Sequence, residues 1–252
     1  MVGSSQSQSM IAVASGKGGV GKTWFSITLA HALGLQNRQV LLFDGDLGLA
    51  NLDIQLGLMP TQDLSNVLAG KITLRQAIFH YDEAPIDIIA GRSGSGGLAN
   101  LTVKRIQILS DDLAKLSTSY DHVILDLGAG VEHTVRHLSH KAGTCIVVIT
   151  DEPTSLTDAY AFIKVTHSER PETEIKIVCN MVNSTREGER TYNTILKACQ
   201  GFLKISPPLL GIIRRDSKVR DAIRKQTPIL TRSPNSEAAD DVNAIALKLL
   251  DK

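Results

Sequence analysis

Residues 15–23, Ser-Gly-Lys-Gly-Gly-Val-Gly-Lys-Thr, constrain this chain more than any other segment. They fit the phosphate-binding pattern G-x-x-x-x-G-K-[ST] and directly follow the apolar run 10–14. A strand that leads through a glycine-rich turn into a helix lets backbone N–H groups and the helix N-terminus converge on phosphate oxygens. In this pattern Lys22 contacts the β- and γ-phosphates, and the Thr23 hydroxyl is a ligand of Mg²⁺. The predicted nucleotide-binding residues here are Gly18, Gly19, Val20, Gly21, Lys22 and Thr23.

The composition of the chain limits which partners and cell compartments are compatible with this loop. The chain has 252 residues and a net charge of +1, so no overall charge attracts nucleic acid or anionic lipid, and such binding would need a local patch. No apolar run reaches the length of a membrane span, and the N-terminus lacks the apolar segment of a secretion signal. The three cysteines are widely spaced and fit reduced core residues of a cytosolic protein.

Buried strands and amphipathic helices alternate along the sequence. The apolar runs are mostly continuous, which is typical of strands covered on both faces. We predict a doubly wound, mostly parallel α/β sheet flanked by helices, in a single domain over 1–252 with a flexible leader at 1–9, a flexible loop at 91–97 and a terminal helix at 236–252. The expected strands are 10–14, 39–43, 86–90, 122–126, 145–149, 175–179 and 209–213. The expected helices are 22–35, 63–70, 73–80, 103–117, 131–141, 155–166, 186–200, 216–225 and 236–250.

Carboxylates follow two of the predicted strands. Asp44 and Asp46 come after strand 39–43, and Asp126 ends strand 122–126 and is followed by Gly128 and Gly130. Because ligands gather at the carboxyl ends of parallel strands, these residues should lie close to the phosphate loop. Mg²⁺ is commonly held by a few carboxylates together with waters and phosphates. The glycines would let the backbone approach the γ-phosphate and move when it leaves.

These motifs resemble a known family. The early lysine in GKGGVGKT at 16–23 is similar to the deviant phosphate loop of the MinD/ParA class of ATPases. DGDLGLANLD at 44–53 and DLGAG at 126–130 resemble the two switch segments of that class. DEPTSLTDAY at 151–160 and LSNVLAG at 64–70 look like its flagellar branch, the FlhG/FleN-type regulators of flagellar number and placement. The resemblance covers roughly residues 10–230.

The resemblance implies ATP and Mg²⁺ as ligands and an ATP-driven homodimer. Lys17 would cross the dimer interface to the partner's phosphates and stabilise the transferring phosphoryl group. Asp46 would orient the attacking water, whereas Asp44 and Asp126 would hold Mg²⁺ together with Thr23. The remaining implied positions are Asn51, Gly128, Gly130 and Glu152 at the switches and dimer face, and Asn180, Arg214 and Asp216 at the base.

Trp24 departs from the pattern of the family. It follows Thr23, where relatives usually carry a smaller or hydroxyl-bearing residue. We include it among the nucleotide-binding candidates, with packing in the core as the alternative. Leu127 likewise replaces a usual Ser or Thr after the second-switch aspartate.

Two surface segments are candidate anchors. The terminal helix at 236–250 has an apolar stripe but few basic residues, so a packed helix is favoured over a membrane anchor. A basic cluster at Arg214, Arg215, Arg220 and Arg224 is a candidate surface for non-specific DNA, a protein partner or solvent.

Three function classes remain open from the sequence. The preferred one is a cytoplasmic switch ATPase, slow and partner-regulated, that sets flagellum number or placement through flagellar proteins and acts in part at the membrane surface or cell pole. A ParA-like DNA-partitioning ATPase or a MinD-like division-site regulator is the alternative. The third class is a metabolic phosphate-loop enzyme, such as a relative of the amidoligases or of the nitrogenase-type reductases. A reductase is disfavoured, since it needs cluster cysteines and Cys145, Cys179 and Cys199 do not fall near a switch.

Overall fold

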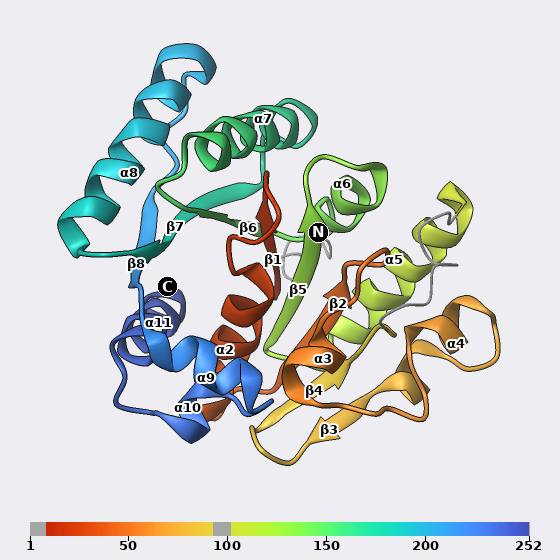
Figure 1. Cartoon of the computed structure of the whole chain (residues 1–252). Coiled ribbons are helices and arrows are strands. Elements are labelled where there is room, and N and C mark those ends of the chain that lie inside the picture. The colour runs from red at the N-terminus through yellow and green to blue at the C-terminus, as the bar shows by residue number, and fades with distance from the viewer. Residues whose placement is uncertain (1–8, 93–101, 252) are drawn as a thin grey trace.

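The computed structural model describes residues 9–92 and 102–251, so nearly all of the predicted leader and most of the loop 91–97 lie outside the described residues. Within these ranges an eight-stranded sheet forms in the order β3-β4-β2-β5-β1-β6-β7-β8, and β3 is the strand that runs antiparallel (Figure 1). The strands are β1 (Met10–Ser15), β2 (Val40–Gly45), β3 (Phe79–Tyr81), β4 (Ile86–Ile89), β5 (His122–Ala129), β6 (Thr144–Ile149), β7 (Glu174–Val182) and β8 (Leu209–Arg214). The predicted mostly parallel α/β sheet is therefore confirmed.

Strand β1 shows why the apolar runs are continuous. Its side chains alternate between the two faces of the sheet, and helices cover both faces. Ile11 and Val13 belong to one buried cluster, whereas Met10, Ala12 and Ala14 belong to the other. Each position of β1 is thus buried, so apolar and polar residues do not alternate in its sequence.

Helices form a layer on each face of the sheet (Figure 1). One apolar cluster joins the sheet to α2, α10 and α11, and the other joins it to α5, α6, α7 and α8. The helices are α2 (Lys22–Leu35), α3 (Leu52–Leu56), α4 (Leu64–Leu68), α5 (Val103–Ser117), α6 (His133–Ser139), α7 (Pro153–Glu169), α8 (Thr185–Ala198), α9 (Ser217–Arg224), α10 (Ile229–Arg232) and α11 (Glu237–Leu250), with a 3-10 turn η1 (Leu74–Ala77) and a π-helical turn η2 (Cys199–Leu203).

The predicted helix at 73–80 is wrong. Thr73 and Gln76 form a capping box, which is a helix-start signal, but only the 3-10 turn η1 follows it. The chain then extends as β3, which pairs with β4 at the sheet edge. The short helices α3 and α10 were not predicted, because five and four residues are too few to show a helical period.

The terminal helix α11 is packed against the domain, as the sequence favoured. Its apolar stripe, including Val242, Ile245 and Leu249, is buried against β8 and α2. Within the residues that the structure describes, no helix has the length and apolar character needed to cross a membrane. The three cysteines are buried and free, in agreement with the prediction of reduced core residues.

Packing of α11 leads to a stability prediction. Ile245 is 1% exposed, and its side chain approaches β8 so closely that a Cβ at Gly211 would lie 2.3 Å from Ile245 Cγ1. We expect Ile245→Ala to lower the free energy of unfolding by about 2–4 kcal/mol, measured by urea denaturation. Leu247→Ala, at a position that is 47% exposed on the same helix, is the matched control and should cost less than about 1 kcal/mol. Equal effects of the two substitutions would show that α11 does not pack in this way.

Candidate nucleotide-binding site

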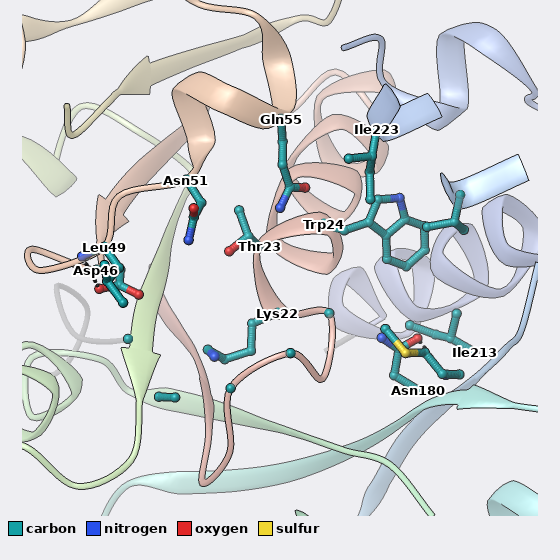
Figure 2. Close-up of a pocket in the computed structure, with 18 of the residues that line it drawn as sticks. Lys22, Thr23, Trp24, Asp46, Leu49, Asn51, Gln55, Asn180, Ile213 and Ile223 are labelled. Atoms are coloured by element: carbon teal, nitrogen blue, oxygen red, sulfur yellow. Dashed lines mark hydrogen bonds between the residues drawn. The ribbon is translucent and has the colours of Figure 1, made fainter. Parts of the chain in front are cut away.

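A cavity of about 1320 Å³ lies at the carboxyl ends of the central strands (Figure 2). It forms there because β1 is placed between β5 and β6, and β2 lies next to β5. The loops that leave these strands meet at one edge of the sheet, where parallel α/β proteins bind ligands. Predicted residues that line this cavity are Gly18, Gly19, Gly21, Lys22, Thr23, Trp24, Asp46, Asn51, Gly128, Asn180, Arg214 and Asp216.

The phosphate loop presents an uncapped helix N-terminus to this cavity. Gly21 precedes α2 with φ 86°, and no side chain caps the helix or adds an acidic group to its first turn. A Cβ at Gly21 would lie 2.5 Å from Nδ2 of Asn180, so both the backbone conformation and the space require glycine. The free N–H groups and the helix dipole therefore remain available for an anion.

Lys22 supplies the cation of the site. Its side chain is buried and points into the cavity (Figure 2). Burial lowers the pKa of Lys22, while the negative charges of Asp126 and Asp46 raise it. Like these aspartates, an anion in the cavity would stabilise the charged form of Lys22.

Asp44 and Asp126 form a buried pair of carboxylates beneath the cavity. They are partners in the register between β2 and β5, and each is 1% exposed. Burial raises the pKa of Asp126 to about 6, although the Thr23 and Ser26 hydroxyls lower it. Burial and the neighbouring Asp126 raise the pKa of Asp44 well above its usual range.

These carboxylates fit Mg²⁺. Oδ2 of Asp44 is buried and makes no hydrogen bond within the described residues, so it is an acceptor that lacks a partner. Nowhere in 9–92 and 102–251 do three His, Cys, Asp or Glu side chains form a metal cage. Mg²⁺ in nucleotide sites is usually held by one or two carboxylates plus phosphates and waters, and Asp126 beside Thr23 offers that donor set.

The two segments after β2 and β5 meet at Asp46. Oδ1 of Asp46 accepts a hydrogen bond from the N–H of Leu49 at 2.9 Å, which shapes the first segment. A Cβ at Gly128 would lie 3.4 Å from the carboxyl carbon of Asp46, so the second segment passes directly beside it. Gly130 has φ 86°, and its N–H donates to the carbonyl of Ser15 at 2.9 Å. The second segment is thus tied to the end of β1.

Lys17 and Glu152 lie together outside the cavity. The ammonium group of Lys17 pairs with the Glu152 carboxylate and donates to Oγ1 of Thr154 at 2.9 Å. The side chains of Lys17 and Glu152 are 37% and 60% exposed. The two residues expected at a dimer face therefore share one exposed surface, at the start of α7.

Asn180, Arg214 and Asp216 line the side of the cavity formed by β7, β8 and the start of α9. Nδ2 of Asn180 donates to the carbonyl of Val20 at 2.8 Å, which fixes the phosphate loop to β7. Asp216 caps α9 through the N–H of Lys218 at 2.9 Å. The apolar side chains Met181, Ile213, Val219 and Ile223 complete this side.

Comparison with known proteins now identifies the family. The description "CobQ/CobB/MinD/ParA nucleotide binding domain" matches residues 11–229. The chain belongs to this family. It is 35% identical to the antiactivator FleN of Pseudomonas aeruginosa over 98% of this chain and 88% of that protein. It is 31% identical to the flagellum site-determining protein YlxH of Helicobacter pylori over 96% of this chain and 82% of that protein.

A solved structure supports the same assignment. The septum site-determining protein MinD of Pyrococcus horikoshii, complexed with Mg-ADP, is 26% identical to this chain. The two superimpose with a TM-score of 0.83 over 97% of this chain and 96% of that one. The sequence-based recognition of the MinD/ParA class is therefore confirmed.

One member of the predicted basic cluster is already neutralised. The guanidinium of Arg214 contacts the Asp241 carboxylate at 2.9 Å and the Glu237 carboxylate at 2.8 Å, both on α11. Arg214 is therefore not a free cation for DNA, and the arginines of the cluster that remain are Arg215, Arg220 and Arg224. The sequence could not show this pairing, because Asp241 is 27 residues away.

The sequence did not predict Gln55 as a cavity residue, and it left two roles open for Trp24. Gln55 projects into it from α3, a helix that was not predicted (Figure 2). Trp24 is 6% exposed and belongs to the apolar core, yet it also lines the cavity. Packing and contact with a ligand are therefore compatible for Trp24.

The buried carboxylates predict a pH dependence of stability. Since the folded-state pKa of Asp126 is raised from 3.8 to about 6, the folded protein retains a proton that the unfolded chain loses. Without Mg²⁺ and nucleotide, the free energy of unfolding should therefore fall as pH rises from 3.8 to about 6, by about 3 kcal/mol from this group. We expect Asp126→Asn to flatten that fall in urea denaturation at a series of pH values. The exposed Asp82→Asn is the matched control, and an unchanged slope in Asp126→Asn would contradict the assignment.

Proposed function

We propose that this chain is an ATP-dependent dimerising switch ATPase that regulates flagellum number or placement. The observation that carries the flagellar part is its similarity to FleN and YlxH over nearly the whole chain. The ATPase part rests on the residues of the cavity. Its action is assigned to the cytoplasm, in part at the membrane surface or cell pole.

In this proposal the phosphate loop and Lys22 bind the phosphates of ATP. The uncapped N-terminus of α2 supplies backbone donors, and Lys22 supplies the charge. Asn180 and the loop that contains Arg214 and Asp216 flank the base. Asp241 of α11 pairs with both the guanidinium and the backbone N–H of Arg214, so other groups of this loop, rather than the donors of Arg214, would contact the nucleotide.

Hydrolysis is assigned to Asp46 and the buried carboxylate pair. Thr23, Asp44 and Asp126 would hold Mg²⁺, which neutralises charge that develops on the phosphates. Asp46 lines the cavity beside Gly128 and would orient the attacking water. The backbone of Gly128 and Gly130 would follow the γ-phosphate and relax when it leaves.

Dimerisation is assigned to the surface that carries Lys17, Glu152 and Asn51. Lys17 would exchange its contact with Glu152 for the phosphates bound by the partner. Because the Lys17–Glu152 pair is exposed, breaking it costs little, about 1 kcal/mol or less. A doubly charged phosphate group can repay that cost, so ATP binding and dimer formation become one event.

A paired substitution tests the nucleotide and dimer roles. Lys22→Ala should abolish ATP binding in calorimetry, because the phosphates lose their principal side-chain cation. Lys17→Ala should still bind ATP but remain a monomer in light scattering with ATP and Mg²⁺, and should not hydrolyse ATP. An ATP-dependent dimer of Lys17→Ala would rule out its role across the interface. Unchanged ATP affinity of Lys22→Ala would overturn the nucleotide site itself.

Flagellum counts in cells that carry variants of this protein test the cellular role. Asp46→Ala should bind ATP and dimerise but lose at least about 10²-fold in turnover, which leaves a locked dimer. If the chain acts as an antiactivator like FleN, cells with Asp46→Ala should carry fewer flagella, and cells with Lys17→Ala more, in electron micrographs. Unchanged flagella together with displaced division septa would favour a MinD-like role. Plasmid or chromosome loss, with salt-sensitive binding of Asp46→Ala to duplex DNA, would favour a ParA-like role.

A further inference from the structure

Helix α6 follows the second switch segment, and one of its side chains reaches the surroundings of Asp46. Val135 of α6 is buried and lines the cavity. A Cβ at Gly128 would lie 3.5 Å from Cγ2 of Val135 and 3.4 Å from the carboxyl carbon of Asp46. Val135 and Asp46 therefore meet Gly128 from the same side. The position of α6 thus limits the space around the carboxylate that is proposed to orient water.

Polar contacts hold α6 between α5 and α7 (Figure 1). The guanidinium of Arg136 donates to both oxygens of the Glu169 carboxylate at the end of α7, with 3.1 Å between Nε and Oε2. Nε2 of His140, which directly follows α6, lies 3.0 Å from the same carboxylate. The contacts with α5 are those of His137 with Gln107 and of Lys141 with Asp111. Glu169 thus binds two side chains of this segment at once.

The first half of α7 is fixed to the phosphate loop. A Cβ at Gly16 would lie 2.0 Å from the carbonyl carbon of Asp158, so the loop rests directly on the backbone of α7. Lys17 adds a hydrogen bond to Oγ1 of Thr154 at 2.9 Å. The same helix therefore contacts the phosphate loop in its first half and, through Glu169 at its end, the helix that follows the second switch segment.

We propose that Glu169 is a positioning residue for ATP hydrolysis. By holding Arg136 and His140 it fixes α6 relative to the phosphate loop, and with α6 the surroundings of Asp46. This inference rests on the proposed hydrolysis at Asp46 and adds to it a residue that acts through α6. The side chains of Arg136 and Glu169 are 40% and 28% exposed, so their contact adds little to overall stability. Its two parallel hydrogen bonds nevertheless fix the geometry between the two helices.

Turnover measured separately from nucleotide binding tests the inference. Glu169→Gln keeps the size of the side chain but removes the charge that binds Arg136. The kcat of ATP hydrolysis should fall about fivefold, which corresponds to about 1 kcal/mol in the barrier. The affinity for ADP in calorimetry and the ATP-dependent dimer in light scattering should stay within about twofold of the unsubstituted protein. A loss of ADP affinity as large as the loss of kcat would show a purely structural role and overturn the inference.

A double-mutant cycle tests whether Glu169 acts through Arg136. Arg136→Gln should lower kcat as much as Glu169→Gln does, and the double variant should be no slower than either single variant, because all three lack the same contact. Arg136→Lys keeps the charge but not the two parallel N–H donors, so its kcat should be intermediate. Additive losses in the double variant would contradict the proposed coupling.

The pair formed by Arg170 and Glu172 supplies the matched control. It is also a contact between an arginine and a carboxylate near the end of α7, but it joins residues two apart in the chain rather than two helices. Glu172→Gln should hydrolyse ATP like the unsubstituted protein. If Glu169→Gln keeps the unsubstituted kcat, or if Glu172→Gln is slowed as much, the role of Glu169 is wrong and the proposed ATPase stands. If the unsubstituted protein does not hydrolyse ATP, the proposed function itself fails.

Discussion

The carboxylates of Asp44 and Asp126 are the constraint on which the rest of the site depends. The parallel register of β2 and β5 places them side by side in the interior, where two negative charges are costly. The fold offsets part of that cost with the Ser26 and Thr23 hydroxyls and with backbone N–H groups of Asp46 and Leu52. Oδ2 of Asp44 remains without a partner among the described residues. The proposed Mg²⁺ would offset the remaining cost at this pair of carboxylates.

The same pair connects the proposed metal site to the first switch segment. Asp44 accepts hydrogen bonds from the N–H of Asp46 and from that of Leu52, the first residue of α3. Any change in charge at Asp44 therefore reaches the residue proposed to orient water and the helix that carries Gln55. In the second segment, Gly128 passes beside Asp46 and Gly130 is bound to Ser15 at the end of β1. The two segments are thus in direct contact with each other and with the end of β1.

Sequence patterns predicted the parts of this molecule whose signals are local. The buried strands and the long helices α2 and α5 lie where the sequence predicts them, since each carries its own pattern over at least five residues, although β5 and β7 each extend three residues further at their carboxyl ends. Features that depend on tertiary contacts were missed. Strand β3 exists because β4 offers a free edge, and α3 forms where Asp44 and Gln226 hold it. The neutralised charge of Arg214 depends on α11, far along the chain.

The contact between Arg214 and α11 bears on how a protein of this class could reach a membrane. Asp241 and Glu237 on α11 bind Arg214 of the loop at the base end of the cavity, and Val242 and Ile245 fill the core beneath it. Moving α11 onto a lipid surface would pull its apolar stripe, which includes Val242 and Ile245, out of the core. It would also leave the guanidinium of Arg214 without its two carboxylates. The loop proposed to flank the base would then lose the contacts that hold it in place. Helix α11 is therefore better suited to stabilising the bound state than to leaving the domain as an anchor.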